Sequence, residues 1–435
     1  MNIPYTRHRL ENGLDILIHE DHGCPIVAVN VWYHVGSKNE KPGRTGFAHL
    51  FEHLMFEGSK HHDKGYFQPL QEAGAALSGS TNADRTNYWE VVPTNALELA
   101  LWMESDRMGY LLPALTDAKF GNQREVVLNE RRQNYENRPY GFAGMAIVAA
   151  LYPPDHPYHW TTIGDAGDIR AARLDDVRAF FQTYYRPRNA SLALAGDVNT
   201  ERVLAMATDY FGPLEAGDEP PPVEFTPPAL SSEVRLLLED RVELPRLYLA
   251  WHSPALFAAG DAELDLVAEV LASGKTSRLY RSLVYEERIA TEIAASQNSR
   301  EIGGFFQIVA TAAPGRSLAE LEQAIERAVG ALITDGPTPL EMERCQAQAE
   351  ANFIYRLQTV GGFGGKSDQL NAYNLYVGDP GFFDNDLERY RQVTPADMQR
   401  AAREWLRPDA RVVLSVVPKD RVDMALGGSQ PVVVA

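Results

Sequence analysis

The sequence has few of the residues that would cross-link it, hold it in a membrane or bind it to nucleic acid. It has only 2 cysteines, Cys24 and Cys345, and cysteines so few and so far apart do not form a disulfide framework. It has no apolar run of about 18 residues, which predicts no membrane insertion. Lys and Arg number 41 against 59 Asp and Glu. The formal charge of -18 argues against a nucleic-acid partner, because a phosphate backbone selects for clustered Lys and Arg.

The amino terminus lacks the apolar core that an export signal carries. It reads Met-Asn-Ile-Pro-Tyr-Thr-Arg-His. We therefore expect a cytoplasmic protein, and the periplasm is the alternative if a signal peptide has been removed. The acidic composition is ordinary for soluble proteins and by itself selects no particular partner.

Residues 49–53, which read His-Leu-Phe-Glu-His, form the most specific motif of the chain. On an α-helix, His49 and His53 project from one face about one turn apart, so both imidazoles can reach a single ion. Glu52 lies on that face as well. A metal that activates water beside a carboxylate that is not a ligand can hydrolyse an amide. The motif is the inverted form of the zinc-peptidase signature, and it predicts a Zn²⁺ site with peptidase chemistry.

The residues around this motif predict an apolar helix. Thr45 and Gly46 can begin it, and Gly58 suits a left-handed stop. The side chains expected to be buried are Phe47, Leu50, Phe51, Leu54 and Met55. The alternative is that the histidines have this spacing by chance and are satisfied core residues. Burying two histidines and a glutamate in such a helix is costly unless something binds them, and this cost favours the metal site.

A second helix can supply the third ligand that zinc needs. Residues 116–135 have helical periodicity and begin with a capping threonine. The expected inward positions are Phe120, Val127 and Leu128. Glu125 and Glu130 are the candidate ligands. The spacing favours Glu130, because it lies two turns after Gln123 on one face, which gives the site both a ligand and a polar neighbour.

With these residues, the chain resembles the inverzincin family that includes pitrilysin, insulin-degrading enzyme and mitochondrial processing peptidase. The family places a glutamate ligand on a later helix, at the separation found here between His53 and Glu130. The resemblance implies that His49, His53 and Glu130 bind Zn²⁺ and that Glu52 is the general base. Residues 80–88 also resemble the family's edge strand. The resemblance covers essentially the whole chain and implies a metalloendopeptidase that cleaves extended peptides or small unfolded proteins.

Two positions depart from the family pattern. Many active members have a second glutamate where this chain has Gln123, and an amide adds no negative charge near the metal. Active relatives also carry an Arg and a Tyr that hold the substrate backbone and the developing oxyanion. In the matching stretch, residues 283–292, these positions are Tyr285 and Glu292, unless a shifted register brings in a nearby arginine.

In part of this family, two homologous subunits divide the work, and this chain resembles the zinc-carrying one. Loss of one oxyanion donor typically costs about a hundred- to a thousandfold in rate. We therefore expect a heterodimer in which a homologous subunit supplies the Arg/Tyr clamp, with a homodimer as the alternative. The competing interpretation is a non-catalytic structural or assembly subunit of the same family.

The two halves of the sequence repeat one pattern. A helical segment, a proline and an apolar strand occur at residues 176–195 and again at 397–417. This repeat predicts two copies of one α+β domain. We expect a zinc-binding domain over residues 1–215, a Pro-rich linker over 216–232 and a homologous domain without zinc over 233–435. The resemblance implies that each is a largely antiparallel sheet packed with helices, and that the two face each other around a cavity.

Three segments have the pattern of strands. Residues 5–19 alternate around an Asn-Gly turn and predict a hairpin, and residues 27–35 predict a further strand. Residues 77–84 are rich in Ser, Gly, Thr and Asn, which suits an exposed edge strand to which an extended peptide adds by main-chain hydrogen bonds. The residues expected to contact the peptide are Ser78, Gly79, Ser80, Thr81 and Asn82.

A glycine-rich segment near the carboxyl end resembles a phosphate-binding loop. Residues 361–367 read Gly-Gly-Phe-Gly-Gly-Lys-Ser, but a true loop of this kind needs a glycine at the position of Val360. We therefore expect a mobile loop or a cavity lining at these residues, and no nucleotide site.

Overall fold

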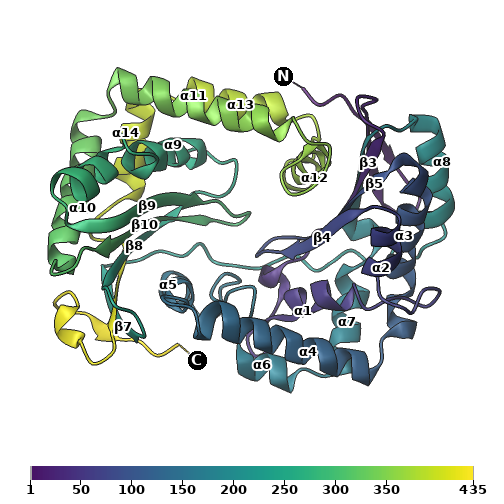
Figure 1. Cartoon of the computed structure of the whole chain (residues 1–435), viewed down its shortest axis with the longest axis horizontal. Coiled ribbons are helices and arrows are strands. Elements are labelled where there is room, and N and C mark those ends of the chain that lie inside the picture. The colour runs from purple at the N-terminus through teal and green to yellow at the C-terminus, as the bar shows by residue number, and fades with distance from the viewer. Residues whose placement is uncertain (1, 435) are drawn as a thin grey trace. The chain divides into compact units, whose positions relative to one another are not determined.

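The first half of the chain builds a six-stranded mixed sheet (Figure 1). The computed structural model describes residues 2–434. The strand order in this sheet is β1-β2-β6-β3-β5-β4. β2 and β6 run parallel, and the other neighbouring strands run antiparallel. The strands are β1 (Thr6–Arg9), β2 (Asp15–Glu20), β3 (Ile26–Tyr33), β4 (Ala76–Thr81), β5 (Thr86–Pro93) and β6 (Ala190–Gly196).

The second half builds a sheet of the same design, in the order β12-β7-β11-β8-β10-β9. β11 runs parallel to β7 and antiparallel to β8, as β6 does to β2 and β3 in the first sheet. This correspondence confirms the predicted fold, two α+β domains with largely antiparallel sheets. The strands are β7 (Val234–Asp240), β8 (Arg246–Ser253), β9 (Ala290–Asn298), β10 (Gly304–Ala312), β11 (Val412–Pro418) and β12 (Gln430–Pro431).

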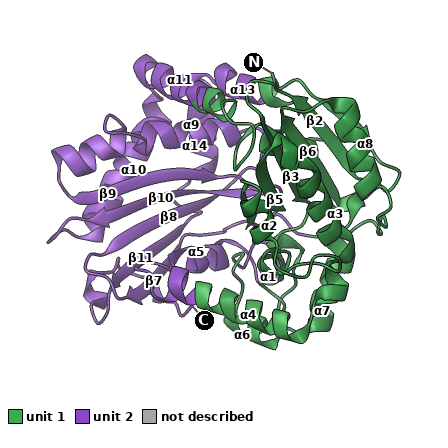
Figure 2. Cartoon of the chain, turned by 45° about the vertical axis from the view of Figure 1, so that its right-hand side comes forward, with its two compact units in different colours: residues 1–130, 161–224, 352–385 green, residues 131–160, 225–351, 386–435 purple. Residues whose placement is uncertain are grey.

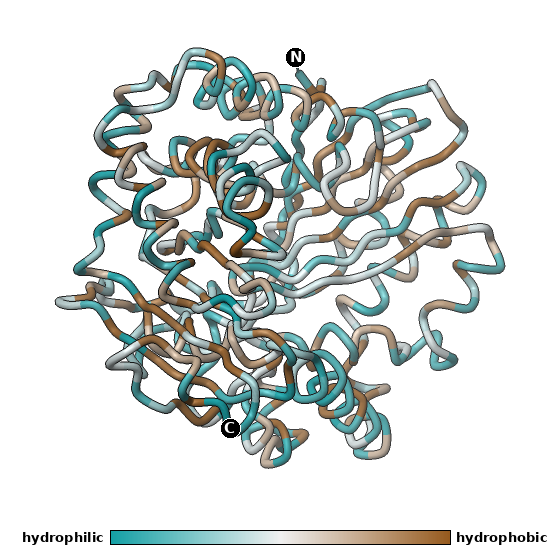
Figure 3. Tube along the Cα trace, turned by 60° about the vertical axis from the view of Figure 1, so that its left-hand side comes forward, coloured by the Kyte–Doolittle hydropathy of each residue, from teal (hydrophilic) through white to brown (hydrophobic). Residues whose placement is uncertain are grey.

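Helices pack on both sheets. Those of the first half are α1 (Phe47–Leu54), α2 (Phe67–Glu72), α3 (Leu97–Ala114), α4 (Asp117–Arg131), α5 (Ala143–Leu151), α6 (Ala166–Ala171), α7 (Leu174–Tyr184) and α8 (Thr200–Phe211). Those of the second half are α9 (Asp261–Ala272), α10 (Leu318–Asp335), α11 (Pro339–Arg356), α12 (Lys366–Tyr376), α13 (Phe383–Gln392) and α14 (Pro395–Trp405). Hydrophobic and hydrophilic residues alternate along many of these helices (Figure 3), as expected for helices that cover a sheet with one face.

The central strands of the first sheet are covered on both faces. On one face, Arg107 of α3 donates a hydrogen bond to Glu90 of β5 at 3.4 Å. On the other face, Asp368 of α12 accepts hydrogen bonds from Asn30 and Trp32 of β3, at 3.2 and 2.8 Å. A strand covered on both faces reads as a nearly continuous apolar run, and every residue of β6 is accordingly buried.

The compact units of the structure differ from the predicted contiguous domains. One unit contains residues 1–130, 161–224 and 352–385, and the other contains the remaining segments, 131–160, 225–351 and 386–435 (Figure 2). The reason is an exchange of helices between the halves. α5, from the first half, packs on β8 and β11, whereas α12, from the second half, packs on β2, β3 and β6. The boundaries 1–215, 216–232 and 233–435 follow the order of the sheets along the chain and miss this exchange.

The strands predicted from alternation are present. β1 and β2 form the expected antiparallel hairpin, in which Thr6 pairs with Ile18 and Gly13 takes a φ of 91° in the turn. β3 occupies the segment predicted at residues 27–35. β4 is the last strand of its sheet, as predicted for an edge strand, but it ends at Thr81, and Asn82 belongs to the following turn.

Side chains of the edge strand alternate between two different surroundings. Thr81 of β4 pairs with Thr86 of β5, and Ala76 pairs with Val91. Because successive strand residues point to opposite faces, Thr81 lies on the face that α1 contacts, where it meets Glu52. Ala76 lies on the opposite face, together with the side chains of β5 that α12 and its preceding loop cover.

No helix among residues 2–434 has the length and apolar character needed to cross a membrane.

Candidate metal centre

The motif helix α1 begins where predicted, but a distant carboxylate caps it. Gly46 has a φ of 85° at the start of the helix. The backbone N–H groups of Gly46 and Ala48 donate to the two carboxylate oxygens of Glu40, at 2.9 and 2.8 Å. A carboxylate at a helix amino terminus satisfies free donors and is favoured by the helix dipole. The side chain of Thr45 does not cap the helix, because its hydroxyl donates a hydrogen bond to Asp168 at 2.7 Å.

The apolar face of α1 fixes the direction in which its polar residues point. The predicted inward side chains, Phe47, Leu50, Phe51, Leu54 and Met55, are all buried. Phe51 stacks on Phe181 and Tyr185, with ring centroids 5.7 and 4.9 Å away. The helix ends at Leu54, four residues before the predicted stop at Gly58. The two histidines therefore lie on the less buried side of a helix that is anchored by aromatic packing.

Three side chains of the motif prediction come together. The Nε2 atoms of His49 and His53 lie 3.6 and 3.3 Å from Oε2 of Glu130. Among residues 2–434, these three form the one group of His, Cys, Asp or Glu whose ligand atoms are close enough to share a metal ion. The other candidate, Glu125, has an exposed side chain on α4 and is not part of this group.

The spacing of these atoms fits a tetrahedral ion. Bonds of about 2.1 Å to His nitrogen and carboxylate oxygen, arranged tetrahedrally, place neighbouring ligand atoms about 3.4 Å apart. The two distances to Glu130 Oε2, 3.6 and 3.3 Å, lie close to that value. Two imidazoles and one carboxylate are also a known donor set of catalytic zinc, which keeps one position open. The residues present therefore fit Zn²⁺.

The electrostatics of His49 favour a neutral imidazole that can bind a metal. Burial and, to a smaller extent, the neighbouring His53 lower the pKa of His49 to about 4, against an opposing effect of Glu130. A neutral imidazole nitrogen has the lone pair that a metal requires. The buried Nδ1 atom of His49 also has no hydrogen-bond partner within the described part of the chain.

Glu52 is positioned beside this group without joining it. Its Oε2 atom accepts a hydrogen bond from Thr81 Oγ1 at 2.7 Å, so the edge strand orients the carboxylate. Burial raises the pKa of Glu52, and the bond from Thr81 partly counters this effect. A carboxylate with raised proton affinity that is held next to a metal site can take a proton from water.

The helix that carries Glu130 agrees with its prediction over most of its length. α4 spans Asp117–Arg131, and Thr116 caps it by accepting a hydrogen bond from the backbone N–H of Lys119 at 3.3 Å. The predicted inward residues Phe120, Val127 and Leu128 are buried. Residues 132–136 continue as a π-helical turn.

Gln123 connects α4 to the segment that follows α1. Its side-chain amide donates to the carboxylate of Glu57, three residues after α1. Lys119, one turn earlier on α4, donates to the backbone carbonyl of Glu57 at 3.0 Å. These bonds tie α4 to the segment that follows α1. Sequence reasoning identified Gln123 as a polar neighbour but did not find Glu57, which has no distinctive motif around it.

Most of the side chains predicted to contact a peptide form hydrogen bonds within the hairpin of β4 and β5. The Ser80 hydroxyl donates to Asn87 at 2.7 Å and accepts from Arg85 at 2.7 Å. Asn82 accepts from the backbone N–H groups of Asp84 and Arg85. Any peptide contact at residues 78–82 would therefore come mainly from the backbone.

The positions expected for an Arg/Tyr clamp lie in the unit that contains the second sheet. Tyr285 belongs to a π-helical segment, Tyr280–Glu286, and is 74% exposed. Glu292 forms an ion pair with Arg246 at 2.9 Å. Neither side chain is an oxyanion donor with the chemistry of the family's arginine.

Sequence comparisons place both halves of the chain in one family. Residues 15–153 match the family model described as Insulinase (Peptidase family M16), and residues 171–349 match the one described as Peptidase M16 inactive domain. The chain is 28% identical over 421 residues to the zinc protease PqqE of Helicobacter pylori, covering 94% of this chain and 92% of that protein. It is 29% identical over 241 residues to the mitochondrial-processing peptidase subunit beta of Caenorhabditis elegans, covering 55% of this chain and 50% of that protein.

Solved structures agree with these matches. A protease from Helicobacter pylori has a TM-score of 0.88 at 26% identity, covering 95% of this chain and 100% of that chain. A peptidase M16 inactive domain from Pseudomonas fluorescens has a TM-score of 0.85 at 18% identity, covering 99% and 100%, and shows the likeness of fold alone. The chain therefore belongs to peptidase family M16, the insulinase family.

Proposed function

We propose that this chain is the zinc-carrying subunit of a metalloendopeptidase that hydrolyses extended peptides or small unfolded proteins. The observation that supports this function best is the set of 3.6 and 3.3 Å contacts that His49 and His53 make with Glu130, with Glu52 held beside them by Thr81 at 2.7 Å. His49, His53 and Glu130 would hold Zn²⁺. The ion would supply a Lewis acid and a high local positive charge.

In this proposal, Glu52 moves the protons of the reaction. Its carboxylate takes a proton from the attacking water and then delivers it to the leaving amine. The raised pKa of Glu52 suits both steps, because burial makes the carboxylate a better proton acceptor than an exposed one. Thr81 keeps the carboxylate oriented while the peptide lies on the edge strand β4.

The central experiment replaces Glu52 and leaves the ligands in place. The Glu52→Gln variant should keep its zinc and lose about 10²- to 10⁴-fold in peptide hydrolysis, which is the usual size of a general-base contribution. Zinc content is measured by atomic absorption, and cleavage with a flexible fluorogenic peptide. Glu201→Gln, the same exchange at an exposed position of α8, is the matched control and should behave as the wild type. Full activity in Glu52→Gln would remove Glu52 from the base role.

We propose a second, homologous chain as the source of the Arg/Tyr clamp, in a heterodimer or alternatively a homodimer. The absence of an arginine at Tyr285 and Glu292 supports this idea. Activity of this chain alone is compared with that of a mixture with a homologue that carries the Arg/Tyr pair. The mixture should be faster by about a hundredfold or more. Equal rates would show that no partner is needed.

The alternative is a structural or assembly subunit without catalysis. The glutamine at position 123 and the missing clamp favour it, whereas the complete group of His49, His53 and Glu130 disfavours it. A purified chain that takes up no stoichiometric zinc on reconstitution would support this alternative and contradict the peptidase.

A further inference from the structure

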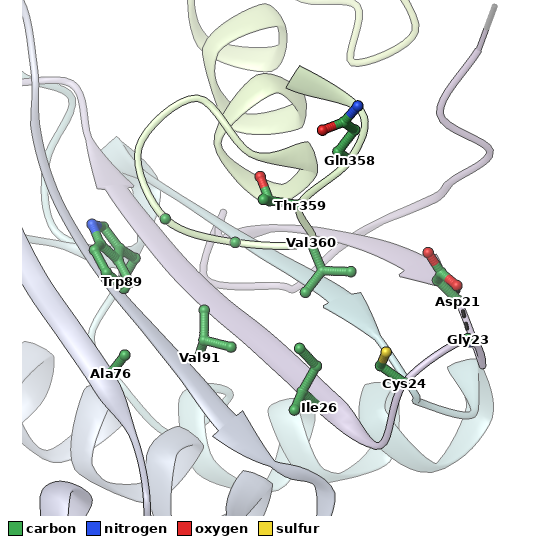
Figure 4. Close-up of a pocket in the computed structure, with 12 residues that line it drawn as sticks. Asp21, Gly23, Cys24, Ile26, Ala76, Trp89, Val91, Gln358, Thr359 and Val360 are labelled. Carbon is green, nitrogen blue, oxygen red and sulfur yellow. Dashed lines mark hydrogen bonds between the residues drawn. The ribbon is translucent and has the colours of Figure 1, made fainter. Parts of the chain in front are cut away.

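Figure 4 shows a cavity of about 530 Å³ in the unit that contains the first sheet. By the register of β4 and β5, it lies on the sheet face opposite to the candidate metal centre. Its floor is formed by Ile26 of β3, Trp89 and Val91 of β5 and Ala76 of β4, and its roof by residues 358–362. These floor side chains are apolar and none of them is fully buried. A concave group of apolar side chains that stays open on a sheet face usually marks a binding site.

The roof of this cavity is held in place. Gly361 lies so close to the sheet that a Cβ atom there would come within 2.5 Å of Ala28 and 2.7 Å of Val91. The N–H groups of Lys366 and Ser367, at the start of α12, donate to the carbonyls of Thr359 and Val360 at 2.9 and 3.0 Å. These contacts hold the glycine-rich segment against the sheet, where it forms part of the cavity lining.

The two ends of the cavity differ in chemistry. At one end, Asp21 is neutralised by Lys366, whose Nζ lies 2.6 Å from its carboxylate. Near Trp89, the ring of Phe363 packs edge-on against the indole, with centroids 5.5 Å apart, and is itself 54% exposed. The cavity therefore offers apolar and aromatic surface and no unpaired charge from these residues, which suits a large apolar side chain.

The register of β4 connects this cavity to the metal centre. The backbone N–H of Asn82 bonds to the carbonyl of Arg85, and bonding alternates along an antiparallel ladder. By this alternation, the backbone groups of Leu77, Gly79 and Thr81 point away from β5, towards the open edge of the sheet. An added strand would pair with these groups.

The same register gives the positions of the added strand's side chains. A residue opposite Thr81 lies at the end of β4 that holds Glu52. A residue opposite Ala76 is five positions away, about 17 Å along the strand, and its side chain points to the other face. In an antiparallel pairing, this second residue lies on the carboxyl side of the first. Ala76 is small and exposed, so it leaves the cavity open towards the edge.

We propose that this cavity is a specificity subsite for a large apolar side chain, such as Phe, Leu, Met or Trp, of the peptide substrate. The side chain belongs to the residue opposite Ala76, about four to six residues to the carboxyl side of the cleaved bond. This inference rests on the proposed peptidase function. It assigns to the sheet face opposite the zinc ligands a role in choosing the substrate.

The subsite is tested by sequencing the products of a cleaved peptide library. Large apolar residues should be enriched over alanine about tenfold at the subsite position, because burial of such a side chain is worth roughly one to two factors of ten in binding. The Ala76→Trp variant fills the entrance of the cavity, so the ratio of large apolar residues to alanine at the subsite position should fall to about one. Ala205→Trp, the same exchange at an exposed position of α8, is the matched control and should keep the enrichment.

Absence of enrichment in the wild type would overturn the subsite while leaving the peptidase intact. Enrichment that persists in Ala76→Trp would also overturn it. If the library is cleaved neither by this chain alone nor by its mixture with a homologue that carries the Arg/Tyr pair, the proposed function fails, and the cavity is then judged by a readout that needs no turnover.

That readout is the alkylation rate of Cys24, which lines the cavity and is exposed, whereas Cys345 is buried. The zinc-loaded Glu52→Gln chain is treated with a maleimide in the presence of two peptides that differ only by Phe or Ala at the subsite position. The Phe peptide should slow the modification of Cys24 at least threefold more than the Ala peptide does, and Ala76→Trp should abolish the difference. Equal rates with both peptides would show that no apolar side chain enters the cavity.

Discussion

The two sheets of this protein share the order of five of their six strands, from β2 to β4 and from β7 to β9, yet within residues 2–434 only the half with the first sheet has a group of side chains that can hold a metal. α1 and α9 occupy equivalent places, because α1 lies between β3 and β4 in the chain, and α9 lies between β8 and β9, the strands that correspond to them in the second sheet. α1 presents His49 and His53 towards Glu130. α9 has no histidine, and the apolar residues Leu264, Val267 and Leu271 bury it against its sheet. The fold thus provides the position, and a few side chains provide the chemistry.

Histidines alone do not make the difference. The second unit also has a pair, His252 on β8 and His156, and His156 contributes to lowering the pKa of His252. Both are partly or fully buried, and the Nε2 atom of each lacks a hydrogen-bond partner within residues 2–434. No carboxylate joins them in a group that could hold a metal in this part of the chain. The two pairs of histidines therefore differ in one respect. A carboxylate from a second helix, Glu130, lies beside His49 and His53, and no carboxylate forms such a group with His156 and His252 among the described residues.

The largest expected effect comes from removal of that carboxylate. Glu130→Gln should weaken zinc binding by more than a hundredfold, because the change removes a ligand, and changes merely around ligands already cost 10- to 100-fold. Peptide hydrolysis should be lost with the metal. Zinc affinity is measured by competition with a chromogenic chelator.

Glu125→Gln is the matched control on the same helix, since its side chain is exposed. It should keep both zinc affinity and cleavage. Loss of zinc in Glu125→Gln together with retention in Glu130→Gln would reverse the assignment of the third ligand.

A second prediction compares the apolar supports of α1 and α9. Phe51→Ala removes a fully buried ring from the zinc half, and Leu264→Ala removes a fully buried side chain from the other half. The expected losses of stability are about 3–5 kcal/mol for Phe51→Ala and 2–5 kcal/mol for Leu264→Ala. Only Phe51→Ala should also weaken zinc binding, because α1 carries both histidine ligands. Urea unfolding and zinc titration of each variant measure the two effects.

Leu340→Ala serves as the reference substitution, because that leucine is 74% exposed. Its stability should change little, as is usual for surface positions. Equal zinc losses in Phe51→Ala and Leu264→Ala would mean that the metal centre depends on general stability and not on the support of its own helix.

The sequence was sufficient for features that depend on local pattern. The apolar face of α1, the hairpin of β1 and β2 and the inward residues of α4 follow from periodicities that neighbouring residues define. Glu130 could be preferred over Glu125 because the spacing of residues along one helix determines which of them lie on the same face.

Features that depend on tertiary partners were not predictable in the same way. Glu40 caps α1 from a separate segment, and no motif marks it. The exchange of α5 and α12 between the halves depends on which sheet face each helix covers, and the sequence of a helix does not specify that face. The role of Gly361 as a close contact of Ala28 likewise requires the packed structure.

The smallest expected effect is a dependence of stability on pH that comes from the second sheet. Burial, with a further contribution from His156, lowers the pKa of His252 to about 4. Above the ordinary histidine pKa of about 6.5 the imidazole is neutral in the folded and unfolded chains, so its burial costs nothing extra. As the pH falls from about 6.5 to 4, only the unfolded chain takes up the proton, so the folded state loses about 1–3 kcal/mol, with allowance for partial exposure.

His252→Gln removes this titration and should flatten the fall of the urea midpoint between pH 7 and pH 4.5. The neighbours that act on His252 are the ring of Tyr152, with centroids 5.4 Å apart, His156 and the backbone of Leu151. The Leu151 backbone raises the pKa of His252, but burial outweighs this effect. The half with the proposed zinc site would differ, because a metal binds imidazoles in their neutral form and its binding opposes their protonation. A wild-type urea midpoint that does not change between pH 7 and pH 4.5 would mean that the pKa of His252 is unchanged by folding. The proposed difference between the buried histidines of the two halves would then be absent.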